Sequence, residues 1–259
     1  LLLIAAPILP RTVLAPDAVV RAYPGIAFSE YHRILIWDFA AKRIAERETQ
    51  SEAVRAQYMY KQVLLIEEFD KRNAKSGDYS EQREVIFLPS GERSERVTKP
   101  AANHLVRLKL TPEDFRDIRE IQPLLLTKDR LWLYQTQPRG EEIIDGILCW
   151  VLEVKPRQLL DGQRLFEGLL WAAQTDFSVI RSQGRAVPQL LSKKEENLFP
   201  LFTTIRHLYG GGYWFPHITL ADDTLPFRSG PLRLRMKLEF SNYQRFNAES
   251  TVQFDTSKP

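Results

Sequence analysis

The sequence predicts an α+β fold in which a curved antiparallel sheet forms an unclosed half-barrel and helices pack over its concave face. Three observations favour it. Residues 232–240 alternate apolar and charged side chains, which is the period of a strand with one dry and one wet face. Residues 202–209 and 213–221 flank three glycines that suit a tight hairpin turn. Only two stretches of the chain have a helical period, against about nine or ten candidate strands.

The first elements are a long helix and a small block of strands. In residues 29–56, apolar positions recur at steps of three and four, and Glu48 continues that row after Ala41 and Ile44. Residues 58–69 follow as a strand, and a polar turn around Asn73 leads into a second strand at 79–88. A turn at 89–91 then predicts a hairpin with a third strand at 92–98.

A second, shorter helix is predicted to start at Thr111. Thr111 can cap it, Pro112 suits its first turn, and Asp114 meets the positive end of the helix dipole. Phe115 and Ile118 share one face of this helix. The remaining strands are expected at residues 131–135, 146–154, 164–174 and 177–183, followed by the three strands of the C-terminal meander.

The domain organisation follows from composition along the chain. Residues 1–27 begin with an apolar run interrupted by Pro7 and Pro10, and are expected to be a truncated signal peptide. Residues 28–247 contain no low-complexity linker and no repeat, which predicts one domain. Residues 248–259 are expected to be a C-terminal tail.

Charge and motifs exclude several classes of function. The chain of 259 residues has 36 basic and 33 acidic residues interspersed along it, so its net charge of +3 does not indicate nucleic-acid binding. Cys149 is the single cysteine and lies in an apolar run, which predicts a buried thiol and no disulfide. No nucleotide-binding, serine-hydrolase or zinc-protease motif occurs, so we expect no cofactor, no resident metal and no enzyme activity.

Two histidines could still share a metal ion. If Tyr209 pairs with Tyr213, His207 and His217 lie diagonally on one face of the hairpin. No third ligand is evident, because Asp222 and its neighbour Asp223 point to opposite faces of a strand. Surface histidines are therefore the preferred interpretation.

The apolar face of the sheet is the stronger candidate site. It offers more apolar surface than two helices easily seal, so it could line a cavity for acyl chains, although a fully packed core is the alternative. Gly168 within the row would suit a cavity, a close backbone approach or a bulge. The candidate lining residues are Leu64, Ile66, Val85, Phe87, Phe115, Ile118, Leu148, Trp150, Leu152, Phe166, Leu170, Leu234, Met236 and Leu238.

The series of motifs along residues 34–247 resembles a known group of proteins. It includes YMYKQ (58–62), FLPSG (87–91), LTPEDF (110–115), FEGLLW (166–171), ENLFP (196–200), YWFP (213–216) and NYQRF (242–246). The series is similar to exported bacterial proteins, of the type common in acidobacteria, that are related to the outer-membrane lipoprotein-sorting LolA/LolB-like superfamily. The resemblance implies an unclosed barrel with helices over its mouth, a periplasmic location, and carriage of lipid or lipoprotein acyl chains without covalent catalysis.

Together these observations predict a periplasmic carrier that binds a lipid or an acylated lipoprotein in an apolar cavity. It would act as a monomer, touch membranes peripherally and meet an envelope protein partner. Two alternatives stay open at this point. One is a structural or interaction module of the cell envelope with a fully packed core, and the other is a hydrolase or metal-dependent enzyme on the same scaffold.

Overall fold

The computed structural model describes residues 28–88, 92–120, 126–159, 164–191, 196–209 and 211–246. The chain divides into two compact units, residues 1–40 and residues 41–259, and the strands among the described residues all belong to the second. The leader expected at 1–27 and the tail expected at 248–259 lie outside the described residues. Within the described parts, no helix combines the length and the apolar character needed to cross a bilayer.

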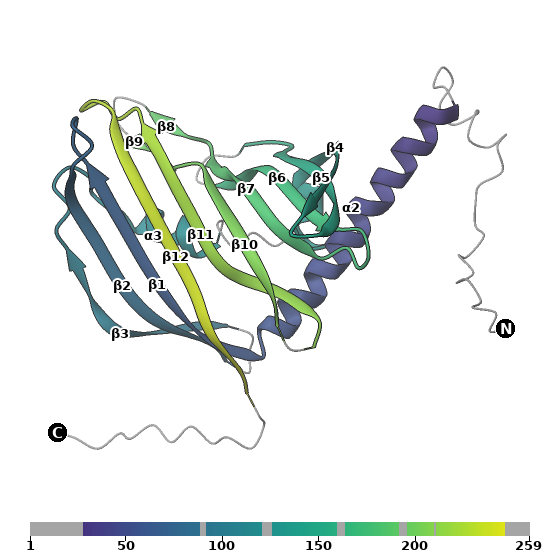
Figure 1. The fold of residues 1–259 in the computed structure, drawn as a ribbon, viewed down its shortest axis with the longest axis horizontal. Helices are drawn as coiled ribbons and strands as arrows, with labels where there is room; N and C mark the ends of the chain where they lie inside the picture. The colour runs from purple at the N-terminus through teal and green to yellow at the C-terminus, as the bar shows by residue number, and fades with distance from the viewer. Residues whose placement is uncertain are drawn as a thin grey trace. The chain divides into compact units, whose positions relative to one another are not determined.

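One antiparallel sheet of ten strands dominates the second unit, and its two edge strands do not meet (Figure 1). The strand order is β3-β2-β1-β12-β11-β10-β7-β6-β5-β4, so the half-barrel stays unclosed, as predicted. A separate two-stranded sheet pairs β8 with β9. The strands are β1 (Tyr58–Phe69), β2 (Lys75–Phe87), β3 (Arg93–Asn103), β4 (Tyr134–Ile144), β5 (Ile147–Pro156), β6 (Leu165–Ala173), β7 (Val179–Val187), β8 (Leu190–Leu191), β9 (Glu196–Asn197), β10 (Phe202–Tyr209), β11 (Tyr213–Leu225) and β12 (Leu232–Arg245).

The C-terminal meander forms as its alternation predicts. β10, β11 and β12 are consecutive neighbours in the sheet, and Tyr209 pairs with Tyr213 across the glycine turn. β12 then pairs with β1, in a register that places Leu64 opposite Leu238. Strands from opposite ends of the sequence therefore share the middle of one continuous inner face, defined here as the face against which the helices lie.

Both edge strands differ from their predicted extent. β3 was expected to end at residue 98 but runs on through Pro100, which an edge strand tolerates because one side of it needs no hydrogen bonds. The strand expected at 131–135 is wrong in position. Residues Leu131–Leu133 form a short 3-10 helix, η1, and β4 begins after it and continues past Pro138 with a bulge.

The helix α2 (Phe28–Arg55) docks its second half onto the sheet through one arginine. The Arg47 guanidinium donates to the Ser178 hydroxyl at 3.0 Å and to the Asp176 carboxylate at 3.3 Å, in the turn between β6 and β7. It also donates to the carbonyl of Gly212 and lies 4.3 Å from the centre of the Tyr213 ring, in the turn between β10 and β11. One side chain thus joins the helix to two separate hairpins.

The helix α3 (Pro112–Glu120) begins with the predicted cap. The Thr111 hydroxyl accepts the backbone N–H of Asp114 at 3.2 Å, and the Asp114 carboxylate accepts the backbone N–H of Thr111 at 2.7 Å. This reciprocal arrangement satisfies donors that a helix start otherwise leaves unpaired. The inner side of α3 carries Ile118, which is buried, and Phe115, whose ring centre lies 5.7 Å from that of Tyr79 on β2.

The sheet also has an apolar cluster on its outer face. Cys149 and Val151 on β5 pack there with Trp171, Ala173 and Ile180. The Trp171 indole N–H donates to the Glu142 carboxylate at 2.6 Å, so its polar atom is satisfied. Cys149 is fully buried, as predicted, and burial raises the pKa of its thiol. Strands β5 to β7 are therefore apolar on both faces, and their outer side is not the plain wet face of a simple alternation.

Candidate functional site

The inner face of the sheet gathers most of the residues expected to line a cavity. Ten of the fourteen side chains are buried and three are half-buried, with Leu148 exposed by 45%. The buried ones are Leu64, Ile66, Val85, Ile118, Leu152, Phe166, Leu170, Leu234, Met236 and Leu238, and the half-buried ones are Phe87, Phe115 and Trp150. That these fourteen residues form a binding surface stays a prediction.

The inward-facing side chains of β5 become more exposed to solvent toward the β4–β5 turn. Leu152 is buried, Trp150 is half-buried, and Leu148 near the β4–β5 turn is exposed. Trp150 packs its ring 6.2 Å from that of Phe177, which in turn lies under the guanidinium of Arg43 on α2. Leu148, Trp150 and Leu152 thus lie on one face of the sheet, as predicted, but differ in their exposure to solvent.

The glycine in the apolar row does not create a void. Gly168 pairs with Gly184 across β6 and β7, and the Phe166 ring lies over both. A methyl group added to Gly168 would lie 2.8 Å from that ring and 2.1 Å from the carbonyl oxygen of Gln183. Glycine is therefore required at Gly168 because the neighbouring backbone and the Phe166 ring lie too close for a side chain. The Phe166 ring fills the space over the two glycines.

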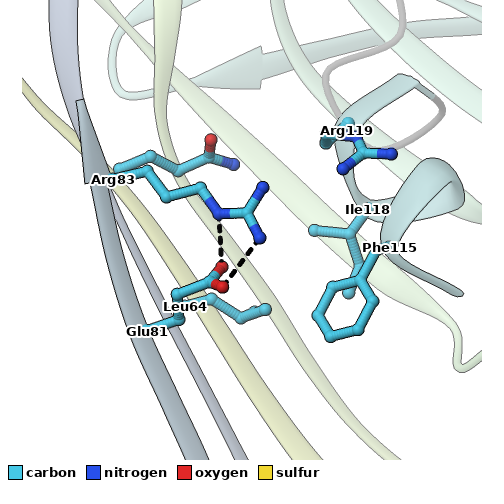
Figure 2. Close-up of a pocket in the computed structure, with 7 residues that line it drawn as sticks. Leu64, Glu81, Arg83, Phe115, Ile118 and Arg119 are labelled. Atoms are coloured by element: carbon cyan, nitrogen blue, oxygen red, sulfur yellow. Dashed lines mark hydrogen bonds and ion pairs between the residues drawn. The ribbon is translucent and has the colours of Figure 1, made fainter. Parts of the chain in front are cut away.

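A small cavity remains between α3 and the sheet, and its volume is about 10 Å³ (Figure 2). Apolar atoms of Leu64, Phe115 and Ile118 form one part of its wall, and Arg119 closes it from the helix side. A volume of this size holds about one water molecule. As it stands, this cavity is too small for an acyl chain.

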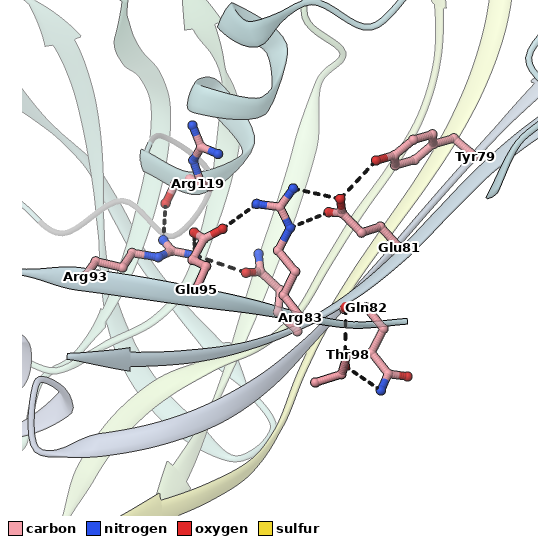
Figure 3. A network of polar contacts seen from close by, with 9 residues as sticks. Tyr79, Glu81, Gln82, Arg83, Arg93, Glu95, Thr98 and Arg119 are labelled. Carbon is pink, nitrogen blue, oxygen red and sulfur yellow. Dashed lines mark hydrogen bonds and ion pairs between the residues drawn. The ribbon is translucent and has the colours of Figure 1, made fainter. Parts of the chain in front are cut away.

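Charged groups beside this cavity form a connected network (Figure 3). The Arg83 guanidinium donates to both oxygens of Glu81, at 2.6 and 2.7 Å, and to Glu95. Glu81 also accepts the Tyr79 hydroxyl at 3.1 Å, and burial followed by the Glu81 charge raises the pKa of Tyr79 to about 12. Arg93 joins from β3, where it pairs with Glu95 at 2.9 Å. The two arginines are thus neutralised by two carboxylates.

A buried ion pair lies deeper under α2. Glu48 and Arg206 are each only 1% exposed, and two parallel N–H···O bonds of 2.8 and 3.0 Å join them. Arg206 lies on β10, so the pair bridges helix and sheet. The pairing was not predicted, although Glu48 was recognised as a member of the apolar row of the helix. A carboxylate in such a row was the available signal, because a buried charge requires a partner.

The two histidines lie side by side in a way that does not suit a shared metal ion. A bulge in β11 brings the rings of His207 and His217 into a stack, with centres 3.8 Å apart and planes within 12°. Ring lone pairs lie in the ring planes, so parallel stacked rings aim them side by side and not at one ion. Asp222 is engaged by Arg233, and among the described residues no group of three potential ligands gathers.

The outer face carries two larger hollows. One of about 520 Å³ has Leu65, Leu201 and Leu220 in its lining, and the other, of about 750 Å³, has Ile205 and Trp214. Both lie along the sheet on the side away from the helices. An acyl chain lying in either hollow would touch the sheet along one side only, which buries less apolar surface than a site between two layers.

No protein-family model and no curated protein matches this sequence. Among solved structures, the chain is similar to a DUF1329 family protein from Desulfovibrio piger, at 17% identity and a TM-score of 0.40, with 82% of this chain and 94% of that chain covered. It is similar to a domain assigned to outer membrane lipoprotein sorting from Vibrio parahaemolyticus, at 11% identity and a TM-score of 0.35, with 78% and 92% covered. A LolA superfamily protein from Nitrosomonas europaea shares 14% identity at a TM-score of 0.34, with 80% and 94% covered.

These neighbours include the class of protein that the sequence motifs resemble, while the acidobacterial type stays a prediction. At such identities and TM-scores, what this chain binds has to follow from its own side chains.

Proposed function

We propose that this protein is an exported, periplasmic carrier that binds the acyl chains of a lipid or an acylated lipoprotein between the inner face of its sheet and α3, without covalent catalysis. The observation that carries the proposal is the continuous apolar row on the inner face, which joins β1 to β12 and reaches beneath a helix of only nine residues. The described form is then the closed, empty carrier.

The apolar part of the cost of uncovering this row is modest. Lifting α3 exposes Ile118, which is buried, and Phe115, which is half-buried. At about 1.5–3 kcal/mol for a fully buried side chain and about half of that for a half-buried one, this loss is about 2–4.5 kcal/mol. An acyl chain regains about 0.8 kcal/mol for each methylene it buries, so about three to six methylenes offset this loss. A chain of ordinary lipid length leaves a surplus.

A buried ion pair would act as the latch of this helix. Asp117 on α3 pairs with Arg164 at 3.2 Å, just before β6, and both side chains are buried. The pair must separate or move as a unit when α3 lifts. Loosening it is therefore expected to favour the open form.

The proposal is tested by mass spectrometry of solvent extracts from the protein purified gently from a bacterial periplasm, together with uptake of a fluorescent fatty acid. Co-extracted phospholipid or acylated peptide in stoichiometric amount is expected. Leu64→Gln should lower uptake because Leu64 lines the inner face, whereas Leu65→Gln, one residue along on the outer face, should leave uptake unchanged. Equal uptake by both folded variants and the parent protein would refute the site.

The latch supplies an independent test of the same proposal. Asp117→Asn should raise the rate of fatty-acid uptake, because α3 is held less firmly. The control is Arg47→Gln, which loosens α2 and leaves α3 in place. A lower or unchanged rate in folded Asp117→Asn protein would argue against α3 as the moving cover.

A second candidate is favoured by one specific observation. The cavity under α3 has room for about one water molecule, and charged networks occupy the neighbouring space. An interaction module of the cell envelope with a fully packed core would look the same in its resting state. A protein that yields no lipid on extraction and takes up no fatty acid would support this candidate in place of the carrier.

A further inference from the structure

We propose that Trp132 and Leu159, with the cations Lys128, Arg130 and Arg157 around them, form a docking surface for anionic lipid bilayers. This group of five residues is called the Trp132 patch below. Trp132 is 70% exposed and Leu159 is 51% exposed. The proposal concerns where the protein meets a membrane, and it holds whether or not the inner face carries cargo.

Hydrogen bonds bring the two parts of the patch together. The backbone N–H of Arg157 donates to the carbonyl of Leu133 at 2.8 Å, and Tyr134 pairs with Pro156 where β4 and β5 begin and end. Trp132 is one residue from that bond and Leu159 is two, so both residues lie at the same end of this strand pair. They come from segments that no local sequence pattern connects.

The patch stands on an ordered turn. Leu126 and Thr127 are fully buried, and the carbonyl of Thr127 accepts the backbone N–H groups of Arg130 and Leu131 at 3.0 and 2.9 Å. The backbone N–H of Lys128 donates to the hydroxyl of Thr49 on α2 at 3.0 Å. Buried anchors therefore hold the exposed residues in place, and little ordering entropy is lost when the patch meets a surface.

The charges around Trp132 favour an anionic surface. Lys128, Arg130 and Arg157 are exposed, and among the described residues none of them lies within salt-bridge distance of a carboxylate. Asp129 is the one acidic side chain in the turn, and a hydrogen bond from Thr127 together with the Arg130 charge lowers the pKa of its carboxyl. Among the described residues of this turn and of the segment after β5, these three cations thus accompany one acidic side chain.

The residue types suit the interface of a bilayer. The indole ring of tryptophan places an apolar body at the acyl boundary and its N–H among the headgroups. Lysine and arginine near an anionic surface contribute about 1 kcal/mol each. A protruding aromatic side chain and a leucine, ringed by cations on a fixed turn, meet these requirements without any deep insertion, which agrees with the peripheral membrane contact expected from the sequence.

Vesicle co-sedimentation tests the proposal with the whole chain. The parent protein should bind vesicles of mixed phosphatidylglycerol and phosphatidylcholine, and bind pure phosphatidylcholine far more weakly. The double variant Arg130→Gln/Arg157→Gln should lose about 25-fold in affinity, as two contributions of about 1 kcal/mol imply. Trp132→Ala should lose about tenfold, while Ile143→Ala, which removes an equally exposed apolar side chain on β4, should change little.

Fluorescence identifies the residue that enters the bilayer. Brominated lipid should quench tryptophan emission of the parent protein, and Trp132→Phe should abolish that quenching while the variant still sediments with vesicles. Arg72→Gln, an exposed charge in the turn after β1, controls for net charge. The proposal is overturned if the parent protein ignores anionic vesicles, which would leave the patch to a protein partner, or if the controls lose as much affinity as the patch variants.

Discussion

The buried pair of Glu48 and Arg206 gives the sharpest test of how α2 is held. Glu48→Gln leaves the volume of the side chain nearly unchanged but removes the negative charge beside a guanidinium that is 1% exposed. Removing one partner of such a pair costs about 3–5 kcal/mol, since the remaining charge stays buried. A Coulomb estimate for charges about 4 Å apart at an effective dielectric constant near 20 also gives about 4 kcal/mol.

This loss is large against the total stability of a folded domain, which is about 5–15 kcal/mol. Replacing both partners with apolar residues, Glu48→Leu with Arg206→Met, should recover most of it because no charge is then left unpaired. The cost of the single substitution therefore exceeds the cost of the double substitution. This ordering distinguishes a desolvated pair from an exposed one, where a single substitution is nearly neutral.

Equilibrium unfolding in urea, followed by circular dichroism, measures these free energies for the parent, for Glu48→Gln and for the double variant. Glu46→Gln is the matched control, because Glu46 pairs with Arg43 on the exposed side of the same helix and its loss should cost less than about 1 kcal/mol. A loss below about 1 kcal/mol in Glu48→Gln, with an unchanged denaturant slope, would refute the assignment of a buried pair.

Three further predictions concern other parts of the fold. Gly184→Ala should destabilise by about 1–3 kcal/mol in urea unfolding, because the new methyl group would lie 2.6 Å from the Phe166 ring; a neutral effect would contradict the close packing. Burial and the neighbouring charge of His207 lower the pKa of His217 in the folded protein, so the unfolded chain binds the proton more readily and stability should fall as pH drops below about 6.5. His217→Asn should flatten that fall in thermal unfolding curves, and an unchanged slope would assign it to other groups. Thr111→Ala should lower the free energy of unfolding by about 1 kcal/mol and should speed amide hydrogen exchange in α3 alone. Faster exchange across the sheet as well would contradict the assignment of a local cap.

Periodicity could predict the parts of the fold in which one face of an element is apolar. It gave β1 its observed bounds and placed the meander strands correctly, because Leu234, Met236 and Leu238 recur at every second position. β4 could not be found in this way, since it lies at an edge, is mostly exposed and contains Pro138 and Gly140. An edge strand is held mainly by backbone hydrogen bonds to its neighbour. Backbone hydrogen bonds do not require particular side chains, so the amino-acid sequence shows little sign of them.

The candidate site, too, could be predicted only in part from the sequence. Alternation predicted which side chains point inward, as the burial of Leu64, Ile66 and Leu170 illustrates, while their role in lining a binding site stays a prediction. It could not show how the space is filled, because the Phe166 ring over paired glycines and the contact of Arg83 with Glu81 depend on which strands become neighbours. Pairing across the sheet is a property of the whole topology.

The adjacency of β1 and β12 has a consequence for how the chain can fold. The first strand and the last are neighbours near the middle of the sheet, and β1 keeps one unpaired edge until the final strand is available. Contacts between residues so distant in sequence form slowly, because a long loop must close before they give any stabilisation. The sheet is therefore complete only once β12 is available, and until residue 245 has been made β1 keeps an unpaired edge that can pair with other chains.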